Sequence, residues 1–365
     1  MTIKESMLAV YRKENKGKIP FAAYEFLFPR GKVERQLRHG GCGVISWCPV
    51  SSLLSPAPVL ATGDFWVYES EVKDVEMSIK AIQEDNQRVF VRTYKTPLGS
   101  VFDKIREDPS YHSPWVKKFL INDPGDYEIV KFIVENTVYH ENYDAFVQAQ
   151  ETMGDDGVIL GLVDRSPWQQ LLIELAGTER LSMDLYDNRS LVEDLLSSIE
   201  KKLDEAYRMA ANSPAEVIWA PENITGDITS PKIFQKYVLP FWNKQAKTLH
   251  RNNKIFAVHL DGKLRCLSDL IRKSNIDVVE SFTLPEGGGD VPIEKASIAW
   301  VNKSLVANLP ASLCFKEEEV IREYVRKLLS DVSPRKDFML EISENLPHPH
   351  WQKCLPVVGD VMQAQ

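Results

Sequence analysis

Short apolar runs alternate with longer helical patterns over most of the chain, and this alternation constrains the fold more than any other feature. Each run has the length of one buried strand. Repeated βα units of this kind build a parallel sheet. With one run near the N-terminus there are eight predicted strands, so we expect an α/β fold, a (β/α)8 TIM barrel. The runs are Pro20–Glu25, Gly157–Val163, Leu181–Leu185, Glu216–Pro221, Lys254–His259, Asp277–Phe282, Ile298–Val306 and Asp337–Ile342.

Two segments between the runs carry apolar stripes at helical spacing. Residues three or four apart share one face of a helix, so we expect both stripes to pack on the barrel. Another helix is expected to begin at Ser230–Pro231, since serine is a favoured N-cap and proline a favoured first residue. The stripes are Leu191, Leu195, Ile199 and Leu203, and Val320, Ile321, Tyr324, Val325 and Leu328.

Residues 43–102 depart from this rhythm, because segments rich in β-forming residues follow one another there. We expect an antiparallel β insertion in this region. Since functional loops sit on the rigid scaffold of a barrel, we expect the insertion to lie over the barrel mouth. Neither a repeat nor a linker divides the rest of the sequence. The chain is therefore predicted to be a single barrel domain over residues 1–365 with an N-terminal elaboration.

The charge and composition exclude several classes of protein. A formal net charge of -8 and a pI near 5.5 are unsuited to neutralising phosphates, so we expect no nucleic-acid partner. We also expect no membrane span and no signal peptide, hence a cytoplasmic protein with a small-molecule substrate. Five cysteines without a C-x-x-C pair are expected to be reduced thiols, most of them buried.

Polar residues at the ends of the predicted strands are the candidates for chemistry, because barrel enzymes place their catalytic groups there. His259 and Asp261 end one run, and Glu222 follows another. Glu280 and Glu341 lie within two later runs. One imidazole among carboxylates fits either a Zn²⁺ site or an acid–base cluster. We predict His259, Glu222 and Asp261 as catalytic residues, and His259, Glu222, Glu280 and Glu341 as metal ligands.

Aromatic residues near the N-terminus could line an apolar substrate pocket and stack on an aromatic ether. They are Tyr24, Phe26, Trp47, Trp66 and Tyr68. An arginine in the insertion could bind a substrate carboxylate, although a solvated surface role is the simpler interpretation. The predicted substrate-binding residues are Tyr24, Trp47, Arg92 and Asn302.

Three segments resemble the uroporphyrinogen-decarboxylase-like superfamily. They are ENITGDITSPKIFQKYVLPFWNKQAKTLH, VHLDGKLRCLSDLIRKSNIDVVESF and FMLEISENLP. In order and spacing the similarity covers roughly residues 150–360 and implies the same barrel. The tetrapyrrole decarboxylases of this superfamily carry an R-Q-A-G-R-Y motif that binds substrate carboxylates, and the corresponding region here, YEFLFPRGKVERQLRHGG, lacks it.

The other branch consists of cobamide-dependent methyltransferases, which bind zinc through H-x-C and a later cysteine. His259 matches the histidine, but Asp261 stands in the cysteine's place, and Glu341 and Glu344 lie where a thiolate is expected. Oxygen ligands make a harder Lewis acid than thiolates. The resemblance thus implies zinc-assisted methyl transfer between a small O- or N-methylated substrate and a corrinoid on a partner protein. The alternatives are a lyase acting on a tetrapyrrole or other acid, and a catalytically silent barrel used for binding.

Overall fold

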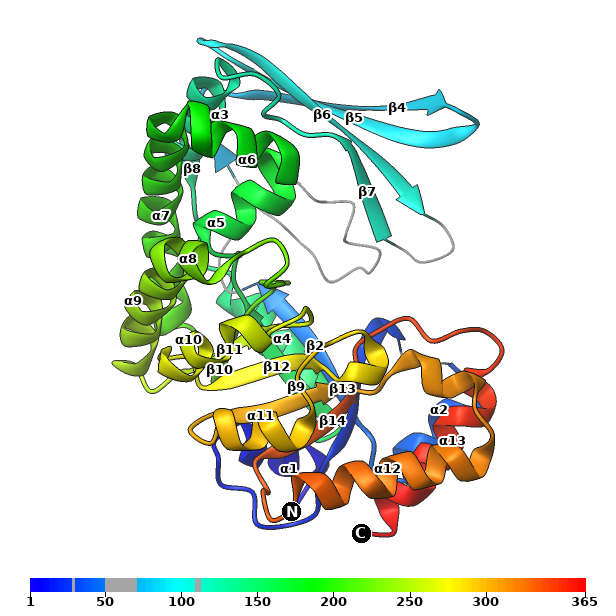
Figure 1. The fold of residues 1–365 in the computed structure, drawn as a ribbon. Coiled ribbons are helices and arrows are strands. Elements are labelled where there is room, and N and C mark those ends of the chain that lie inside the picture. Colours follow the sequence, from blue (N-terminus) through cyan, green and yellow to red (C-terminus); the bar gives the residue numbers. More distant parts are fainter. Residues whose placement is uncertain (28–29, 50–70, 109–112) are drawn as a thin grey trace. The chain divides into compact units, whose positions relative to one another are not determined.

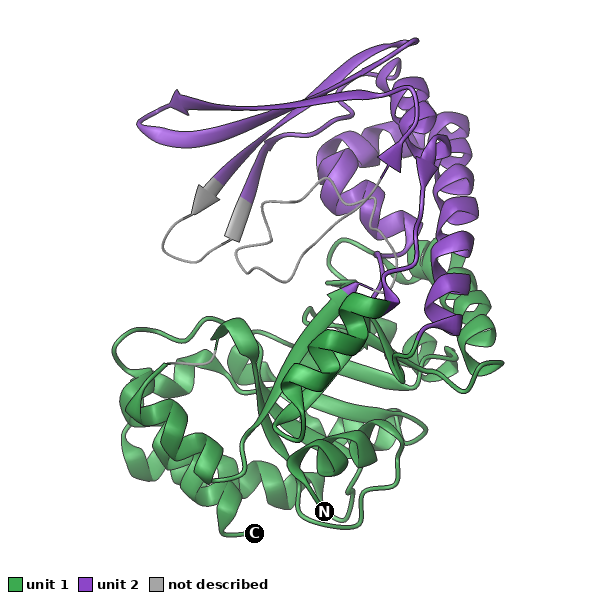
Figure 2. Ribbon diagram, turned by 180° about the vertical axis from the view of Figure 1, so that it is seen from behind, with its two compact units in different colours: residues 1–48, 144–161, 214–365 green, residues 49–143, 162–213 purple. Residues whose placement is uncertain are grey.

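The computed structural model describes residues 1–27, 30–49, 71–108 and 113–365. The chain divides into two compact units, each built from separate stretches of sequence (Figure 2). The first comprises residues 1–48, 144–161 and 214–365, and the second comprises residues 49–143 and 162–213. The two stretches that make up the second unit are both inserted between elements of the first unit.

A closed barrel of parallel strands forms the first unit, which confirms the predicted (β/α)8 fold (Figure 1). Around the barrel the strands follow the order β1-β14-β13-β12-β11-β10-β9-β2. Nearly every residue of these strands is buried, as expected where helices cover a parallel sheet. The strands are β1 (Phe21–Tyr24), β2 (Gly43–Pro49), β9 (Gly157–Leu162), β10 (Val217–Ala220), β11 (Ile255–His259), β12 (Val278–Thr283), β13 (Ser304–Asn308) and β14 (Phe338–Ile342).

Two of the strand predictions need correction. Leu181–Leu185 lies in helix α6 (Gly177–Asp187), where Leu181 and Asp184 are buried at helical spacing. The missing strand is β2, which the sequence had placed in the insertion. All of its residues are buried, as in a barrel strand rather than an exposed hairpin. In addition, the predicted run Ile298–Val306 begins in helix α11, and its strand starts only at Ser304.

Helices connect and cover the barrel strands. The stripe predicted from Ile321 to Leu328 faces inward on α12, although Val320 is exposed. Ser230 caps α8 as predicted, with its side chain accepting a hydrogen bond from the Ile233 N–H. The helices of this unit are α1 (Ile3–Tyr11), α2 (Lys32–His39), α4 (Tyr143–Met153), α8 (Pro231–Ile233), α9 (Leu239–His250), α10 (Ser268–Lys273), α11 (Ile293–Ala299), α12 (Glu318–Val332) and α13 (Trp351–Gln363).

The second unit contains the predicted antiparallel sheet, with different bounds. Its strands in spatial order are β4 (Glu76–Glu84), β5 (Gln87–Thr96), β6 (Gly99–Asp108) and β7 (Ser113–Lys118). Helix α7 (Arg189–Asn212) packs against α3 (Asp126–Glu135), α5 (Pro167–Gln170) and α6, and it buries Leu195, Ile199 and Leu203 of its predicted stripe, whereas Leu191 is half-buried. Strands β3 (Glu71–Val72) and β8 (Thr137–Val138) form a separate antiparallel pair.

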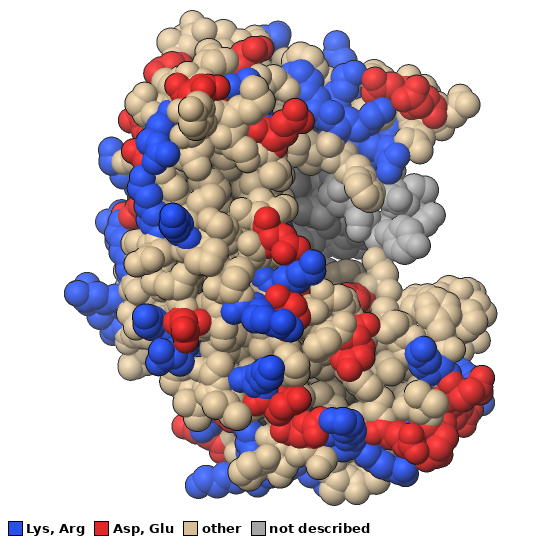
Figure 3. All heavy atoms as spheres, viewed as in Figure 1, with Lys and Arg blue, Asp and Glu red and all other residues tan. Residues whose placement is uncertain are grey.

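The surface charges and the cysteines can be compared with what the composition predicts. Acidic and basic side chains are interspersed on the face drawn in Figure 3. All five cysteines are free thiols, and only Cys266 is exposed, as expected for small apolar residues. Within the described ranges, no helix combines the length and apolar character that crossing a membrane requires.

Candidate active site

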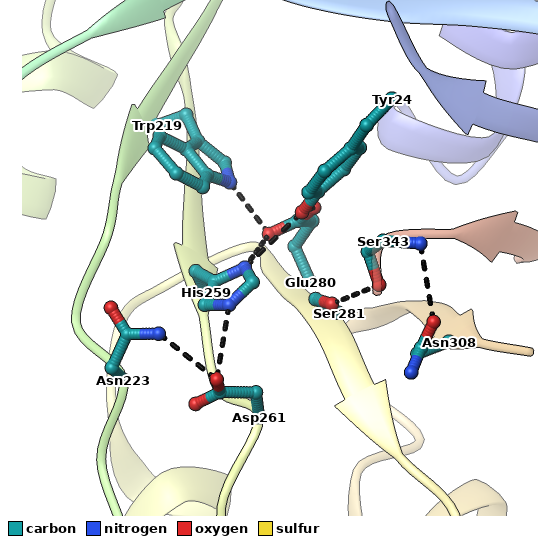
Figure 4. Close-up of polar contacts among 9 residues, drawn as sticks. All are labelled: Tyr24, Trp219, Asn223, His259, Asp261, Glu280, Ser281, Asn308 and Ser343. Carbon is teal, nitrogen blue, oxygen red and sulfur yellow. Dashed lines mark hydrogen bonds and ion pairs between the residues drawn. The ribbon is translucent and has the colours of Figure 1, made fainter. Parts of the chain in front are cut away.

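His259 is the last residue of β11, and its imidazole lies at the carboxyl end of the barrel among side chains from neighbouring strands (Figure 4). The ring Nδ1 lies 2.9 Å from Oε2 of Glu280 on β12. It also lies 3.2 Å from the hydroxyl of Tyr24 on β1. Only 8% of His259 is exposed. The orientation of the imidazole is therefore set by groups from two other strands.

Glu280 joins three strands by accepting hydrogen bonds from across the barrel. The Tyr24 hydroxyl donates to Oε1 over 2.5 Å, and the Trp219 indole N–H from β10 donates to Oε2 over 2.6 Å. The carboxylate is fully buried. Because buried polar and charged groups are tolerated only when they are paired and hydrogen-bonded, these donors and His259 satisfy the oxygens of Glu280.

A β-bulge in β12 places Glu280 and the following residue, Ser281. The register of β12 against β13 shifts between Val279 and Phe282, so that two residues of β12 face the single residue Val306. Ser281 has a left-handed backbone with φ of 55°. Its hydroxyl lies 2.6 Å from that of Ser343. A bulge changes the direction in which side chains point. A non-glycine residue with a left-handed backbone is strained. Both features are common at functional sites.

The other imidazole nitrogen of His259 faces a second carboxylate. Nε2 lies 3.5 Å from Oδ2 of Asp261. Asn223 donates a side-chain hydrogen bond of 2.9 Å to the same oxygen, and its backbone N–H donates to the His259 carbonyl. Asn223 reaches both groups through a left-handed backbone with φ of 49°. Tyr24, Glu280, His259 and Asp261 thus form a continuous polar chain, here called the Tyr24–Asp261 chain.

The charges of this chain control the protonation of His259. Burial alone would lower the pKa of the imidazole, but the charge of Glu280 and the bond and charge of Asp261 together raise it to about 10. Burial alone would raise the pKa of Asp261, whereas its bond to His259 lowers it below the ordinary value. At neutral pH His259 is consequently an imidazolium between two carboxylates.

Aromatic rings border the chain. The ring centroids of Tyr24 and Trp47 are 4.3 Å apart, and those of Trp47 and Trp219 are 5.1 Å apart. Trp219 in turn lies edge-on to His259 at 5.6 Å. Phe26 contacts Tyr24 and Trp47 and is 68% exposed. These rings place an apolar wall beside the imidazolium.

Several buried polar atoms close to these strand ends have no hydrogen-bond partner. They include the Trp47 indole N–H, the Asn308 amide nitrogen, the Thr283 hydroxyl and both carboxyl oxygens of Glu341. Burial and the charge of Glu280 raise the pKa of Glu341 well above its ordinary value. Unpaired buried polar groups are rare in native proteins, and a bound ligand or water is a common explanation.

The structure separates the predicted site residues into two groups. His259, Asp261, Glu280, Tyr24 and Trp47 lie together in and beside the Tyr24–Asp261 chain. Electrostatic interaction with Glu280 and His259 also places Glu341 close by.

The other predicted residues point elsewhere. Glu222 accepts a 2.9 Å hydrogen bond from the indole of Trp242 on α9. Asn302 precedes β13 at the opposite end from Asn308, where its amide donates to the Arg272 carbonyl. The insertion's arginine forms a buried ion pair within its own sheet, with Arg92 Nε 2.9 Å from Asp103 Oδ1. Trp66 and Tyr68 lie outside the described residues.

Sequence reasoning missed three residues of the site. Asn308 ends β13 just as His259 ends β11, and extending the predicted run to its true end would have found it. Trp219 lies within β10, where a tryptophan in a buried apolar run gives no signal that distinguishes it from a core residue. Ser281 gave no signal, because a bulge cannot be read from alternation.

Within the described residues, the four predicted zinc ligands are not grouped around one point. Glu222 is bonded to Trp242, and the oxygens of Glu280 are occupied by Tyr24, Trp219 and His259. In the described part of the chain, no three His, Cys, Asp or Glu side chains are grouped to hold a metal ion.

A closed (β/α)8 barrel with a buried acid–base chain at the carboxyl ends of its strands has the architecture of a barrel enzyme. The family model for uroporphyrinogen decarboxylase (URO-D) matches residues 107–347, and the chain belongs to that family. No curated protein sequence matches the chain.

Two solved structures are similar to the chain at low sequence identity. A methyltransferase from Methanosarcina mazei is 13% identical, with 100% of this chain and 99% of that chain covered and a TM-score of 0.55. A Listeria monocytogenes structure titled as a vitamin-B12-independent methionine synthase is 13% identical, covering 62% of this chain and 69% of that chain, with a TM-score of 0.37. The first similarity supports the fold.

Proposed function

We propose that this chain is a methyltransferase that moves a methyl group between a small O- or N-methylated substrate and a corrinoid carried by a separate protein. The observation that carries this proposal is the Tyr24–Asp261 chain, which holds His259 as a buried imidazolium beside an aromatic wall. When a methyl group leaves an oxygen, that oxygen gains an electron pair and needs a proton. His259 is placed to donate one.

The corrinoid would supply the nucleophile that accepts the methyl group. The chain's own residues would bind and orient the donor substrate. Trp47 and Tyr24 offer ring surface for its apolar part, and the unpaired N–H groups of Trp47 and Asn308 offer donors for its oxygens. After transfer, Glu280 and Asp261 would favour reprotonation of His259 by keeping its pKa high.

The alternative is a lyase that acts on a tetrapyrrole or another acid. The match to the uroporphyrinogen decarboxylase family supports this alternative. Against it stands the charge of the site. Among the described residues, no lysine or arginine contacts Tyr24, Glu280, His259 or Asp261. A polycarboxylate substrate would meet two carboxylates there, and the one cation that the structure describes near them, His259, is already paired with both, which is unfavourable.

Methyl transfer from a panel of methoxy and methylamino compounds to reduced free cobalamin tests the proposal, followed by the change in the corrinoid spectrum. We expect activity in the wild type and loss in His259→Gln. His250→Gln is the matched control, because His250 also contacts a carboxylate, Asp277, at 2.8 Å but lies on the exposed end of α9. Carbon dioxide released from a carboxylic acid substrate, with no methyl transfer from any donor, would establish the lyase instead.

Zinc binding remains a prediction from the sequence, and elemental analysis tests it separately. The sequence predicts zinc in dialysed wild-type protein and its loss in His259→Ala, with His250→Ala retaining the metal. Wild-type protein that is free of zinc after exposure to it, yet transfers methyl groups, would remove zinc from the proposal and leave His259 as the acid.

A further inference from the structure

Strand β4 is an edge strand of the four-stranded sheet. It pairs with β5 on one side, and no described strand pairs with its other side. Its register with β5 runs unbroken from Glu76 to Glu84. Proteins usually blunt such edges with proline, bulges, short strands or charged side chains, because the free backbone groups recruit other strands. β4 has no proline and no bulge, and its charged side chains are Glu76, Lys80 and Glu84.

The hairpin loop identifies which backbone groups are free. Asp85 and Asn86 both have positive φ, 54° and 57°, and form a two-residue loop between Glu84 and Gln87. In such a loop the flanking residues form a hydrogen-bonded pair. The N–H and C=O groups of Glu84 therefore point toward β5, and so do those of the other even-numbered residues of β4. The N–H and C=O groups of the odd-numbered residues point away from β5. These residues are Met77, Ile79, Ala81 and Gln83.

Three odd-numbered side chains of this edge, Met77, Ile79 and Ala81, are apolar and exposed. Met77 is 57% exposed and Ile79 is 46% exposed, and both lie on one face of the sheet with Ala81. On the same face, their β5 neighbour Tyr94 is buried. Ile79 itself lies opposite Arg92 of β5, whose buried ion pair with Asp103 is on the same face. These side chains extend this face to an edge with nothing across from it in the described residues.

We propose that β4 pairs antiparallel with β4 of a second copy of this chain, joining two four-stranded sheets into one. Pairing a strand with itself about a two-fold axis is the standard way in which an isologous dimer extends a sheet. The sequence of β4 also selects the register.

Full-length pairing would be centred on Lys80. It would set Lys80 opposite Lys80 and Glu76 opposite Glu84, and like charges directly opposite destabilise a sheet. Pairing centred on Ile79 sets Ile79 opposite Ile79 and Met77 opposite Ala81, with no like charges directly opposite. It uses the free backbone groups of Met77, Ile79 and Ala81 and covers their apolar side chains.

Sedimentation velocity over a wide range of protein concentration tests this dimer. We expect the wild type to pass from monomer to dimer as concentration rises. Ile79→Lys should remain monomeric, because two lysines would face each other at the two-fold axis. Ile82→Lys is the matched control: in this register residue 82 faces Glu76 of the second copy, so the dimer should persist.

Amide hydrogen exchange of the wild type provides a test that needs no variant. Protection of the Met77, Ile79 and Ala81 amides should rise with protein concentration, whereas those of Ser78 and Lys80, which face β5, should change little. A wild-type monomer at every concentration would overturn the proposal. So would a dimer that leaves the three amides unprotected, or protection that does not depend on concentration, which would indicate a segment of the same chain on this edge.

Discussion

The Nδ1 atom of His259 lies 2.9 Å from Oε2 of Glu280, and the same oxygen accepts the indole N–H of Trp219. The carboxylate therefore holds the imidazole in one orientation and stabilises its protonated form. This arrangement resembles the way a carboxylate orients a catalytic histidine in other enzymes.

Replacing Glu280 with glutamine should lower the pKa of His259 from about 10 toward the ordinary range near 6.5. The replacement keeps the shape of the side chain but removes its charge. NMR titration of the imidazole carbon-bound protons measures this, with His259→Gln used to assign the resonance. Wild-type His259 should remain protonated through pH 8. A wild-type resonance that titrates near pH 6.5 would contradict the charge assignment.

Single substitutions in the buried Arg92–Asp103 pair should be strongly destabilising. The two side chains are 2% and 1% exposed and share two hydrogen bonds. Arg92→Ala or Asp103→Ala leaves an uncompensated buried charge, with an expected cost of about 3–5 kcal/mol in the free energy of unfolding. Urea denaturation measures it. The double variant Arg92→Met/Asp103→Leu should recover most of the loss, and equal destabilisation of single and double variants would argue against the pair.

Lys303 should make stability depend on alkaline pH. Its ammonium group is buried and donates to the carbonyls of Ser274 and Ile276, and burial lowers its pKa to about 8. The unfolded chain titrates near 10.4, so between these values the unfolded state binds more protons and stability rises with pH.

Relative to Lys303→Met, wild-type stability should increase by up to about 3 kcal/mol between pH 8 and 10.4. Urea denaturation of both proteins at several pH values provides the comparison. A difference that stays constant across this range would show that the lysine is charged in the folded protein throughout.

The strain at Ser281 can be separated from its hydroxyl contact by comparing two substitutions. Ser281→Gly and Ser281→Ala both lose the contact with Ser343, but only glycine accepts φ of 55° without strain. We expect the glycine variant to be the more stable by about 1 kcal/mol. The same pair at Ser304, in the regular strand β13, should show the opposite order. Thermal unfolding of the four variants measures both differences.

Most of the barrel could be predicted because its strands are buried on both faces and read as continuous apolar runs. β2 was misassigned for a topological reason. The next helix of the barrel unit, α4, comes only after the long stretch 50–142. The alternation of strand and helix is therefore interrupted by the second unit. The same kind of interruption between β9 and β10 led to a false strand in α6.

The strand-end rule located His259, Asp261 and Glu280, because parallel strands bring their carboxyl ends to one edge. It could not give the direction of Glu222, which follows β10 and turns toward α9. Nor could it show that Glu280 accepts bonds from Tyr24 and Trp219, since those distances depend on the closure of the barrel.

The bulge in β12 also changes the phase of the strand. Glu280 points into the barrel, and regular alternation would send Phe282 inward as well. Phe282 instead packs outward, edge-on against Trp300 at 5.4 Å, because the extra residue resets the alternation. One strand thereby presents Glu280 and Ser281 consecutively to the barrel interior. A deletion of one residue here would return β12 to regular phase and remove a polar position from the site without shortening the barrel.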